Sequence, residues 1–560
     1  MTSTSFKSSV VYQIYPRSFQ DSNSDGIGDL NGIKERIPYL KKLGIDMVWL
    51  NPIYRSPDVD NGYDISDYRQ IQPVFGTMPD FDDLLTKLHQ AGIKLMMDLV
   101  VNHTSSEHEW FRESKKSKDN PYSDFYIWRD PVDGHEPNNW GSIFSGSSWT
   151  YVPERGQYYL HLFAPEQPDL NWNNPAVRHK VHDIMHFWLD KGVDGYRLDA
   201  INLISKPDGL PDAPQPKGAK YGAAQEIVSC GPHFEEYLRE MNQEVLSKYA
   251  VTTVGEMDNT TPEQAARYAN LNGSELNMIF QFAHVNLSPN PNPTLGKWND
   301  EPVKLVELKH VLSRWEEALD GKAWNSLYWN NHDQPRAVSR FATDEQKYRE
   351  TAAKMLGTTL HLMQGTPYIY EGEELGMTNA HFTKLSQYED LDSINAYHQF
   401  VDQQHLVSPK TMLKYLADRS RDNSRTPMQW DDGANAGFSD VTPWFDLNPN
   451  YHEINADEAL KDSDSTFYYY QKLIALRHKL KIIQLGDYHL LDPQDDTVFA
   501  YKRHYAGQTL LVLANFTDDE VSRDYGQGTA KCLLIDNYHS QTPIVLKPYE
   551  AKAFIFDEER

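Results

Sequence analysis

Cysteine is nearly absent from this 560-residue chain, which contains only Cys230 and Cys532. Two cysteines so far apart in the sequence argue against a disulfide framework and against a metal site built from thiolates. Because disulfides persist mainly in oxidising compartments, their expected absence is typical of a cytoplasmic protein, and this is the location that we predict.

Long hydrophobic runs and positive charge are also in short supply. No segment approaches about 18 consecutive apolar residues, and the N-terminal sequence MTSTSFKSSVVYQIYPRSF has neither an apolar core nor a small-residue cleavage site. We therefore expect no insertion into a membrane. Acidic residues outnumber basic ones by 80 to 54, for a net charge of −26. Such a field repels phosphate backbones, so a nucleic-acid partner is not expected.

The chain instead contains a regular alternation of apolar segments and segments of helical period. Segments such as LNGIKERIPYLKKLG, FDDLLTKLHQAG and VRHKVHDIMHFWLDKG have helical period and end at a glycine that can cap a helix. Eight strands are expected, beginning near Val10, Met47, Lys94, Gly195, Val251, Leu276, Asn325 and Thr366. This predicts an α/β fold of the (β/α)₈ TIM-barrel type. A doubly wound open sheet is the less favoured alternative, because no glycine fingerprint follows the first strand.

Two segments depart from this rhythm and define the expected domains. Residues 104–171, after the third strand, are rich in Ser, Asp, Asn, Gly, Pro and Trp and are predicted to form an inserted subdomain over the barrel mouth. A second excursion follows the eighth strand, at about 376–462. From residue 482 to 560 the pattern changes to short strands, which predicts a C-terminal antiparallel β-sandwich. Residues 1–103 and 172–481 then form the barrel.

Polar residues close four of the predicted strands. In a barrel of this type the carboxyl ends of the strands meet at one mouth, where catalytic groups lie. A single Asp at such a position is more often a helix cap or a solvated residue, but four acidic or histidine-bearing strand ends favour a site. Paired carboxylates are what retaining glycoside hydrolysis requires. The residues are Asp98, His103, Arg197, Asp199, Glu256, His332 and Asp333.

Several ordered motifs resemble those of glycoside hydrolase family 13, the α-amylase family, and within it the oligo-1,6-glucosidase and α-glucosidase group. The resemblance covers nearly the whole chain. The four family motifs are DLVVNH (98–103), GYRLDA (195–200), VGEM (254–257) and NNHD (330–333). Further matches to the group are DNGYD (60–64), EQPDLNW (166–172), TPYIYEGEELGM (366–377) and RDNSRTPMQW (421–430).

The resemblance implies roles for three carboxylates. Asp199 would be the nucleophile, Glu256 the general acid and base, and Asp333 the carboxylate that supports the transition state. Arg197 lies two residues before Asp199, on the same side of the strand, where a guanidinium can keep the nucleophile ionised. Glu256 must be protonated at the start, so a less polar site or a nearby negative charge is expected around it.

The resemblance also implies a set of residues that bind the sugar. His103 and His332 would donate to glucose hydroxyls, and Asp60 with Arg421 would form an ion pair that closes the innermost pocket. Tyr63 would stack on the terminal glucose, Phe163 and Gln167 would form a wall of the pocket, and Phe144 and Phe282 would line the neighbouring site. For each aromatic residue, ordinary packing is an equally good interpretation.

The segment DSNSDGIGD, residues 21–29, predicts a metal loop. Side-chain oxygens recur at Asp21, Asn23, Asp25 and Asp29, a glycine occupies the sixth position, and the carbonyl of Ile27 would be a fifth ligand. A full EF-hand is excluded because Gly32 stands where it needs glutamate. Related glucosidases have a similar loop, so we expect a structural Ca²⁺ far from the sugar. Mg²⁺, or a turn with solvated acids, is the alternative.

The preferred bond depends on Ala200, the residue after the proposed nucleophile. Members of the group that prefer α-1,6 bonds usually have Val here, and Ala leaves more room, so we expect α-1,4 bonds such as maltose to be favoured, with α-1,6 bonds such as isomaltose and sucrose retained. Alternatives are an oligo-1,6-glucosidase, a sucrose isomerase and a non-catalytic transporter-associated relative. The arginine-rich loop of the isomerases is not apparent in residues 305–324. The expected partner is a short oligosaccharide, and monomer or homodimer stays open.

Overall fold

The computed structural model describes residues 5–526, 530–539 and 543–557. Its centre is a parallel sheet in the order β11-β10-β9-β5-β2-β1-β13-β12, and a parallel bridge between Ile279 and Asn325 joins its two ends into a barrel. This confirms the predicted (β/α)₈ barrel and excludes the open sheet. The strands, each within a predicted segment, are β1 (Val11–Ile14), β2 (Met47–Leu50), β5 (Lys94–Val100), β9 (Gly195–Asp199), β10 (Thr252–Glu256), β11 (Met278–Phe280), β12 (Ser326–Leu327) and β13 (Thr366–Tyr370).

Each barrel strand is followed by a helix of the outer ring. The predicted helix over residues 30–44 is divided into α2 (Leu30–Glu35) and α3, with Pro38 in the first turn of the second piece. Gly44 and Gly92 cap their helices in the left-handed conformation, as the sequence suggested. The ring consists of α3 (Ile37–Leu43), α4 (Met78–Ala91), α6 (Pro175–Asp190), α8 (Phe234–Glu244), α9 (Pro262–Tyr268), α10 (Leu305–Leu319), α12 (Arg349–His361) and α17 (Thr466–Lys479).

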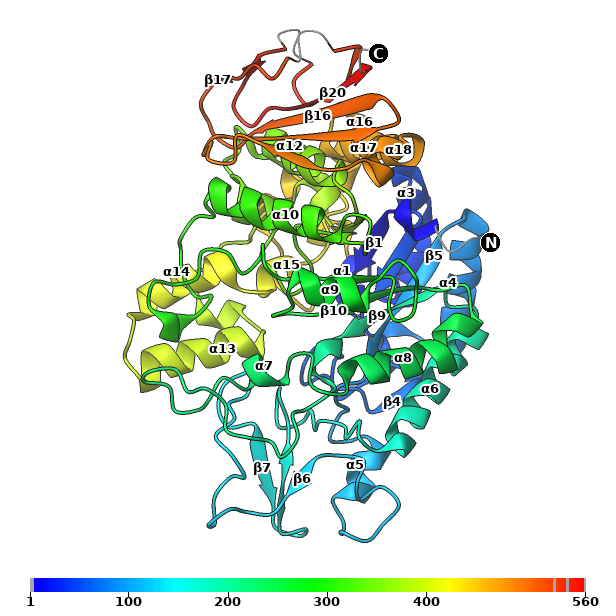
Figure 1. Ribbon diagram of the computed structural model, residues 1–560, viewed down its shortest axis with the longest axis vertical. Coiled ribbons are helices and arrows are strands. Elements are labelled where there is room, and N and C mark those ends of the chain that lie inside the picture. Colours follow the sequence, from blue (N-terminus) through cyan, green and yellow to red (C-terminus); the bar gives the residue numbers. More distant parts are fainter. Residues whose placement is uncertain (1–4, 527–529, 540–542, 558–560) are drawn as a thin grey trace.

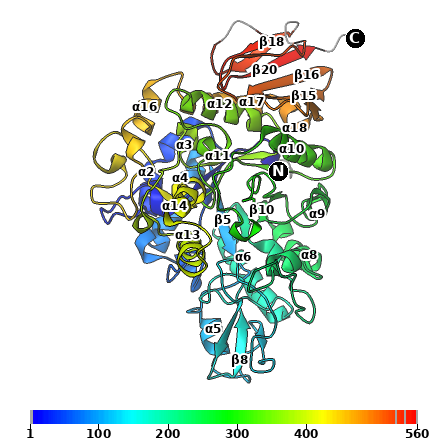
Figure 2. The same cartoon turned by 90° about the vertical axis from the view of Figure 1, so that its left-hand side faces the viewer.

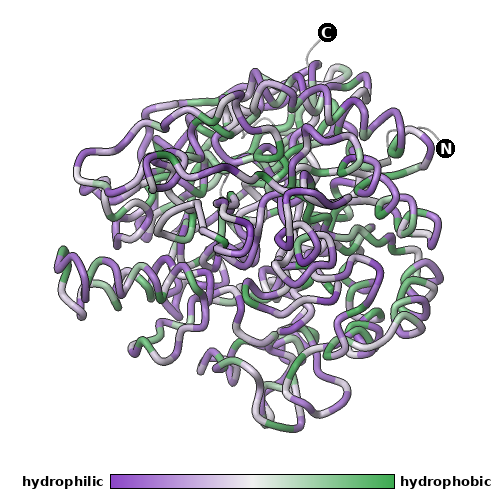
Figure 3. Tube along the Cα trace, turned by 90° about the horizontal axis from the view of Figure 1, so that it is seen from below, coloured by the Kyte–Doolittle hydropathy of each residue, from purple (hydrophilic) through white to green (hydrophobic). Residues whose placement is uncertain are grey.

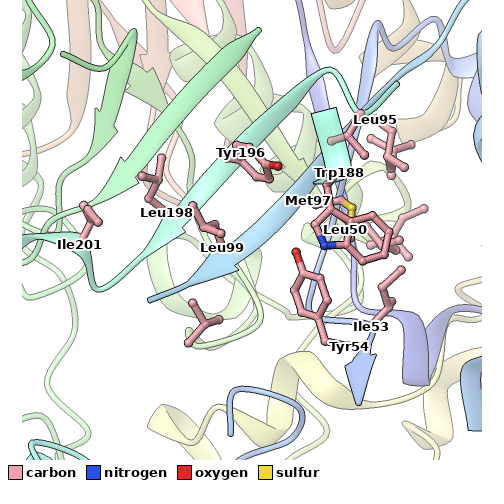
Figure 4. Packing of buried hydrophobic residues seen from close by; sticks show 14 of the residues in the cluster. Leu50, Ile53, Tyr54, Leu95, Met97, Leu99, Trp188, Tyr196, Leu198 and Ile201 are labelled. Atoms are coloured by element: carbon pink, nitrogen blue, oxygen red, sulfur yellow. The ribbon is translucent and has the colours of Figure 1, made fainter. Parts of the chain in front are cut away.

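Alternation along the strands separates two hydrophobic clusters. Successive side chains of a strand point to opposite faces, so Leu95 and Met97 of β5 face the helices while Met96 faces the barrel interior. Figure 4 shows the outer cluster, in which Met97 and Leu50 lie beside Trp188 of α6. Because Asp98 follows Met96 by two residues, the same alternation turns this carboxylate into the barrel at its mouth.

The inserted segment forms a small subdomain beyond the carboxyl ends of the strands. It contains α5 (Glu109–Ser114) and an antiparallel sheet in the order β6-β8-β7, made of β6 (Trp128–Arg129), β7 (Trp149–Val152) and β8 (Gln157–Leu160). Figures 1 and 2 place it at one end of the molecule, opposite the C-terminal sheet. A backbone bridge between His103 and Asp169 ties its two ends together.

The C-terminal segment forms the expected antiparallel domain. Its sheet has the order β14-β15-β16-β20-β18, and the short pair β17 (Val521–Ser522) and β19 (Val545–Leu546) covers it through Val521 and Leu546. The sheet strands are β14 (His489–Leu491), β15 (Val498–Tyr505), β16 (Gln508–Asn515), β18 (Cys532–Asp536) and β20 (Ala551–Asp557). Residue 482, where the sequence placed the domain boundary, lies inside the helix α18 (Lys481–Leu485), and the first strand begins at His489.

Buried charges join this domain to the barrel. Arg503 of β15 donates from Nη1 to Glu316 Oε2 of α10 at 2.8 Å, and both side chains are almost fully buried. Lys309, also on α10, donates to the backbone carbonyls of Asp492, Asp495 and Val498. Removing one partner of such a buried pair would leave the other charge buried and unpaired, at a large cost in free energy. These contacts therefore fix the orientation of the C-terminal domain on the barrel.

The excursion over residues 376–462 contains several short helices, which its composition did not indicate. It contains α13 (Leu391–Tyr397), a π-helical turn (His398–Gln403), α14 (Pro409–Arg419), α15 (Asp422–Arg425) and α16 (Ala456–Lys461). In the part of the chain that is described, no helix combines the length and apolar character needed to cross a bilayer. Figure 3 accordingly shows hydrophilic and hydrophobic residues interleaved along the trace.

Candidate active site

A buried guanidinium lies where three barrel strands end. Arg197 Nη1 lies 2.9 Å from Asp98 Oδ1 and 2.6 Å from Asp199 Oδ1, and its Nη2 lies 2.7 Å from Glu256 Oε1. The parallel register explains this convergence, since Arg197 of β9 stands beside Asp98 of β5 and beside Val254 of β10. Three carboxylates therefore share one cation that is only 1% exposed.

The two predicted catalytic carboxyl groups have different pKa values because their surroundings differ. Burial raises the pKa of Glu256 to about 8, although the Arg197 guanidinium opposes the shift. Burial raises the pKa of Asp199 less far, to about 7, against the same guanidinium. Glu256 Oε2 also accepts a hydrogen bond from the Ala200 N–H at 2.9 Å. Glu256 therefore retains its proton to a higher pH than Asp199 does, as an acid and a nucleophile respectively require.

Asp333 occupies a different electrostatic environment. Its Oδ1 lies 3.0 Å from Arg421 Nη1 and 2.9 Å from Arg425 Nη2. Burial opposes ionisation, but His332, Arg421 and Arg425 together hold the pKa of Asp333 well below its usual range. Asp333 is therefore a permanent anion at neutral pH, suited to stabilise a positively charged transition state.

Arg421 forms closer contacts with Asp390 than with the predicted partner. Its Nε donates to Asp390 Oδ1 at 2.9 Å and its Nη2 pairs with the same oxygen, whereas Asp60 Oδ1 lies 3.8 Å away. Asp60 Oδ2 instead accepts from Gln167 Nε2 at 3.0 Å. The Asp60 and Arg421 pair thus exists at the edge of ion-pair range, within a larger buried network that includes Asp390.

The two histidines are neutral and have different polar neighbours. Burial lowers the pKa of His103 to about 4 and that of His332 to about 3. His332 Nε2 lies 3.1 Å from Asp333 Oδ2, and its Nδ1 lies 2.9 Å from Gln13 Nε2. His103 Nε2 lies 3.1 Å from the Tyr63 carbonyl and 3.2 Å from Gln167 Nε2. Polar neighbours within hydrogen-bonding distance therefore orient both rings at the site.

Aromatic side chains from separate segments surround this group. Tyr63 stacks on His332 with ring centroids 5.3 Å apart and donates to Asp98 Oδ2 at 2.9 Å. Phe163 lies 5.0 Å from His103 and 5.5 Å from Phe144, centroid to centroid. The Arg421 guanidinium lies 5.3 Å above Phe144. The inserted subdomain therefore contributes to one side of the site.

Phe282 is the predicted residue that the structure does not join to this group. It lies two residues after β11, is half-buried, and packs against the cluster shared by the barrel interior and the C-terminal sheet. Within the described ranges no ring contact links it to another predicted site residue. Its assignment to a neighbouring sugar site stays a prediction.

Comparisons with known proteins agree with this geometry. A family model described as α-amylase, catalytic domain, matches residues 13–486. The oligo-1,6-glucosidase of Halalkalibacterium halodurans is 53% identical over 100% of both chains, and the α-glucosidase of Pediococcus pentosaceus is 54% identical over 98% of both. A crystal structure of trehalose-6-phosphate hydrolase from Bacillus licheniformis has a TM-score of 0.92 and 47% identity, and the match covers 99% of this chain and 100% of that one.

The chain belongs to the α-amylase family. It is a glycoside hydrolase of the α-glucosidase and oligo-1,6-glucosidase type. The matches to these two relatives cover the whole chain, including the inserted subdomain and the C-terminal domain. The non-catalytic alternative raised by the sequence is thereby set aside.

Three side chains of the site were not among the residues singled out in the sequence. Arg425 lies inside the group motif at 421–430, so the sequence contained a signal for it. Trp49, whose indole donates to Asp98 Oδ2 at 3.2 Å, looks like any buried strand residue in the sequence. Asp390 lies in the helical excursion outside any motif, and only the fold brings it to Arg421.

The predicted metal loop packs against the segment around 438–444. Asp21 accepts from the backbone N–H groups of Asn23, Ser24 and Gly26, and from the Ser439 hydroxyl. Asp29 caps α2 through the N–H of Gly32. The donors are oxygens, as calcium requires, but in the described part of the chain the three loop aspartates do not form a close cluster of ligand atoms. Calcium binding stays a prediction.

The paired pKa values predict a narrow, bell-shaped pH profile of kcat/KM. Activity needs ionised Asp199, so it falls as the pH drops through about 7, and protonated Glu256, so it falls as the pH rises through about 8. Glu256→Gln should lower kcat/KM by about 10²–10⁴-fold and remove the alkaline limb.

Glu373→Gln is the matched control for this profile. Burial raises the pKa of Glu373 to about 8 as well, but Glu373 bonds to Tyr470 behind β13 rather than to a residue of the site. The alkaline limb should survive in this variant. If the alkaline limb of the pH profile persisted in Glu256→Gln, the general acid would be another residue.

Proposed function

We propose that the protein is a retaining, exo-acting α-glucosidase that releases single glucose units from the non-reducing ends of short oligosaccharides and disaccharides. The observation that carries the proposal is the attachment of Asp199 and Glu256 to the two terminal nitrogens of one buried guanidinium. Retaining glycosidases need two carboxyl groups about 5–5.5 Å apart, and one guanidinium holds such a pair side by side.

The chemistry proceeds in two displacements. Asp199, ionised, attacks the anomeric carbon, while the proton on Glu256 passes to the departing glycosidic oxygen. Glu256, now a carboxylate, takes a proton from water, and the water oxygen replaces Asp199 at the anomeric carbon. Asp333, an anion at neutral pH, stabilises the positive charge that develops on the sugar ring in both transition states.

End-trimming is supported by the network of Asp60, Asp333, Asp390 and Arg421. Asp60, Asp390 and Arg421 are buried, Asp333 is partly buried, and two salt bridges hold Arg421 in place. Charged groups locked in this way can bind the hydroxyls of a terminal glucose. They leave no passage for a chain that continues beyond it, because displacing them would leave buried charges unpaired.

The linkage preference is proposed from Ala200. This residue follows the nucleophile in a left-handed conformation, with φ of 41°, and is 8% exposed. Its small side chain leaves space beside Asp199 for the acceptor sugar, which favours maltose-like α-1,4 bonds while α-1,6 bonds and sucrose remain substrates. Relatives named as oligo-1,6-glucosidases support the α-1,6 alternative, and one side chain discriminates by only about 1–3 kcal/mol.

Product analysis on a small substrate panel tests the proposal. Purified protein is incubated with maltose, isomaltose, sucrose, trehalose 6-phosphate and a long dextrin, and the products are resolved over time. We expect glucose from the disaccharides, fastest from maltose, and little attack on the dextrin. Isomaltulose or trehalulose from sucrose would identify an isomerase, and exclusive cleavage of trehalose 6-phosphate would identify a phosphosugar hydrolase.

Substitution of Ala200 tests the steric argument. Ala200→Val adds two γ-methyl groups beside the nucleophile and should raise the isomaltose-to-maltose ratio of kcat/KM by about tenfold. A β-branched residue at positive φ is strained, so some loss of thermal stability is also expected. Ala200→Ser, which adds no methyl group, should leave the ratio unchanged. Equal ratios in the wild type and the valine variant would refute the argument.

We also propose that residues 21–29 bind Ca²⁺ and stabilise the fold, because Asp21, Asn23 and Asp25 each accept the backbone N–H two residues on and so wind their oxygens around one loop. Gly26 supplies the positive φ of 87° that the turn needs. Ca²⁺ should raise the melting temperature of the wild type by a few degrees at saturation. This increment should vanish in Asp25→Ala and persist in Asp440→Ala, which removes a nearby carboxylate outside the loop. An increment that survives in Asp25→Ala would contradict the site.

A further inference from the structure

Two histidines and an aspartate gather at the edge of the C-terminal sheet, away from the catalytic mouth. Asp487 precedes β14, His489 begins β14, and His504 lies near the end of β15. Asp487 Oδ2 lies 3.2 Å from His489 Nε2, and Asp487 Oδ1 lies 3.0 Å from His504 Nδ1. One ligand atom from each residue lies within 4.8 Å of the other two. Among the described residues, no other group of three His, Cys, Asp or Glu side chains has its ligand atoms this close together.

The backbone holds these side chains on one face. His489 pairs with Lys502 in the antiparallel ladder, and His504 follows Lys502 by two residues, so the two imidazoles emerge on the same side. Their ring centroids are 4.9 Å apart. Asp487 is fixed by the register as well, because its Oδ1 accepts the backbone N–H of His504 at 2.7 Å. The cluster is thus preorganised by the strands.

These spacings are close to those around a tetrahedral transition-metal ion. Ligands that lie about 2.0–2.2 Å from Zn²⁺ at tetrahedral angles are about 3.3 Å from one another. His504 Nδ1 lies 3.0 Å from Asp487 Oδ1 and His489 Nε2 lies 3.2 Å from Asp487 Oδ2, each within a few tenths of an ångström of this value. The two distances involve different carboxylate oxygens, and a set with one atom from each residue lies within 4.8 Å. Two imidazoles and one carboxylate are ligands that suit Zn²⁺ and its neighbours better than Ca²⁺ or Mg²⁺.

Solvent can reach the cluster. The side chains of His489, Asp487 and His504 are 55%, 46% and 34% exposed, so a hydrated ion can enter and keep water in its remaining position. Lys502, half-buried and opposite His489, is the neighbouring positive charge that opposes a cation. The carboxylate of Asp487 offsets it.

We propose that Asp487, His489 and His504 form a binding site for a divalent transition-metal ion, with Zn²⁺ as the representative. On coordination the imidazole protons that face Asp487 move to the other ring nitrogens or to solvent, and the metal takes their place. The ion would join the short edge strand β14 to β15, and so brace the connection between the last barrel helices and the C-terminal sheet. Catalysis would not depend on it.

Calorimetric titration of the full-length protein with ZnCl₂, in buffer containing saturating CaCl₂, tests the site. We expect one Zn²⁺ per chain, binding at least tenfold more weakly in His489→Ala and in His504→Ala. Lys502→Gln should bind Zn²⁺ more tightly, since it removes the opposing charge. His539→Ala is the matched control, because His539 forms a similarly exposed pair with Asp464 and should leave the affinity unchanged.

Two further measurements distinguish loss of the metal site from loss of the folded structure. Glucosidase activity should be the same in wild type and His489→Ala without Zn²⁺, which shows that the variant is folded. Zn²⁺ should raise the melting temperature of the wild type and of His539→Ala, but not that of His489→Ala. Failure of the wild type to bind Zn²⁺, or binding that is unaffected by both histidine substitutions, would overturn the proposal, while the glucosidase assignment would stand.

Discussion

Arg197 is enclosed by Asp98, Asp199 and Glu256 at the mouth of the barrel, and its positive charge makes this concentration of buried acid tolerable. Three carboxylates with one guanidinium resist full ionisation in a poorly solvated site, so at least one proton is retained at neutral pH. The position of that proton decides the chemistry. Glu256 has the higher pKa, so it holds the proton more firmly than Asp199 does.

The barrel supplies this arrangement through its register. Asp98 and Arg197 pair on neighbouring parallel strands, and Glu256 lies on the next strand, two residues beyond the partner of Arg197, so all three side chains meet at the carboxyl ends of the strands. A second group of charges, Arg421 with Asp333 and Asp390, is delivered by segments after the seventh and eighth strands. The first group would perform the reaction and the second would hold the end of the sugar.

Much of this could be predicted from the sequence, for identifiable reasons. The barrel strands are buried apolar runs between helices of clear period, and polar residues end them. Both the strands and the three catalytic candidates could therefore be predicted. The helices of residues 376–462 were missed because their apolar positions are sparse among polar ones. Asp390 was missed because a lone acid on such a segment has no local signature, and its role exists only through contact with Arg421.

Two further details emerge only from the fold. The predicted pair of Asp60 and Arg421 is present at 3.8 Å, but the fold also places Gln167 within hydrogen-bonding distance of Asp60. The start of the C-terminal sheet was placed in α18, because the apolar residues Ile482 and Ile483 suit a strand as well as a helix that packs on β15. Short apolar runs leave this ambiguity open.

The location of the proton can be measured directly by infrared titration of protein labelled with ¹³C-glutamate, as a difference between the wild type and Glu256→Gln. The buried Glu371, Glu373 and Glu374 cancel in this difference, which isolates Glu256. The account predicts a protonated-carboxyl band at pH 7 that is lost as the pH rises through about 8. A difference spectrum that shows Glu256 already ionised at pH 7 would contradict it.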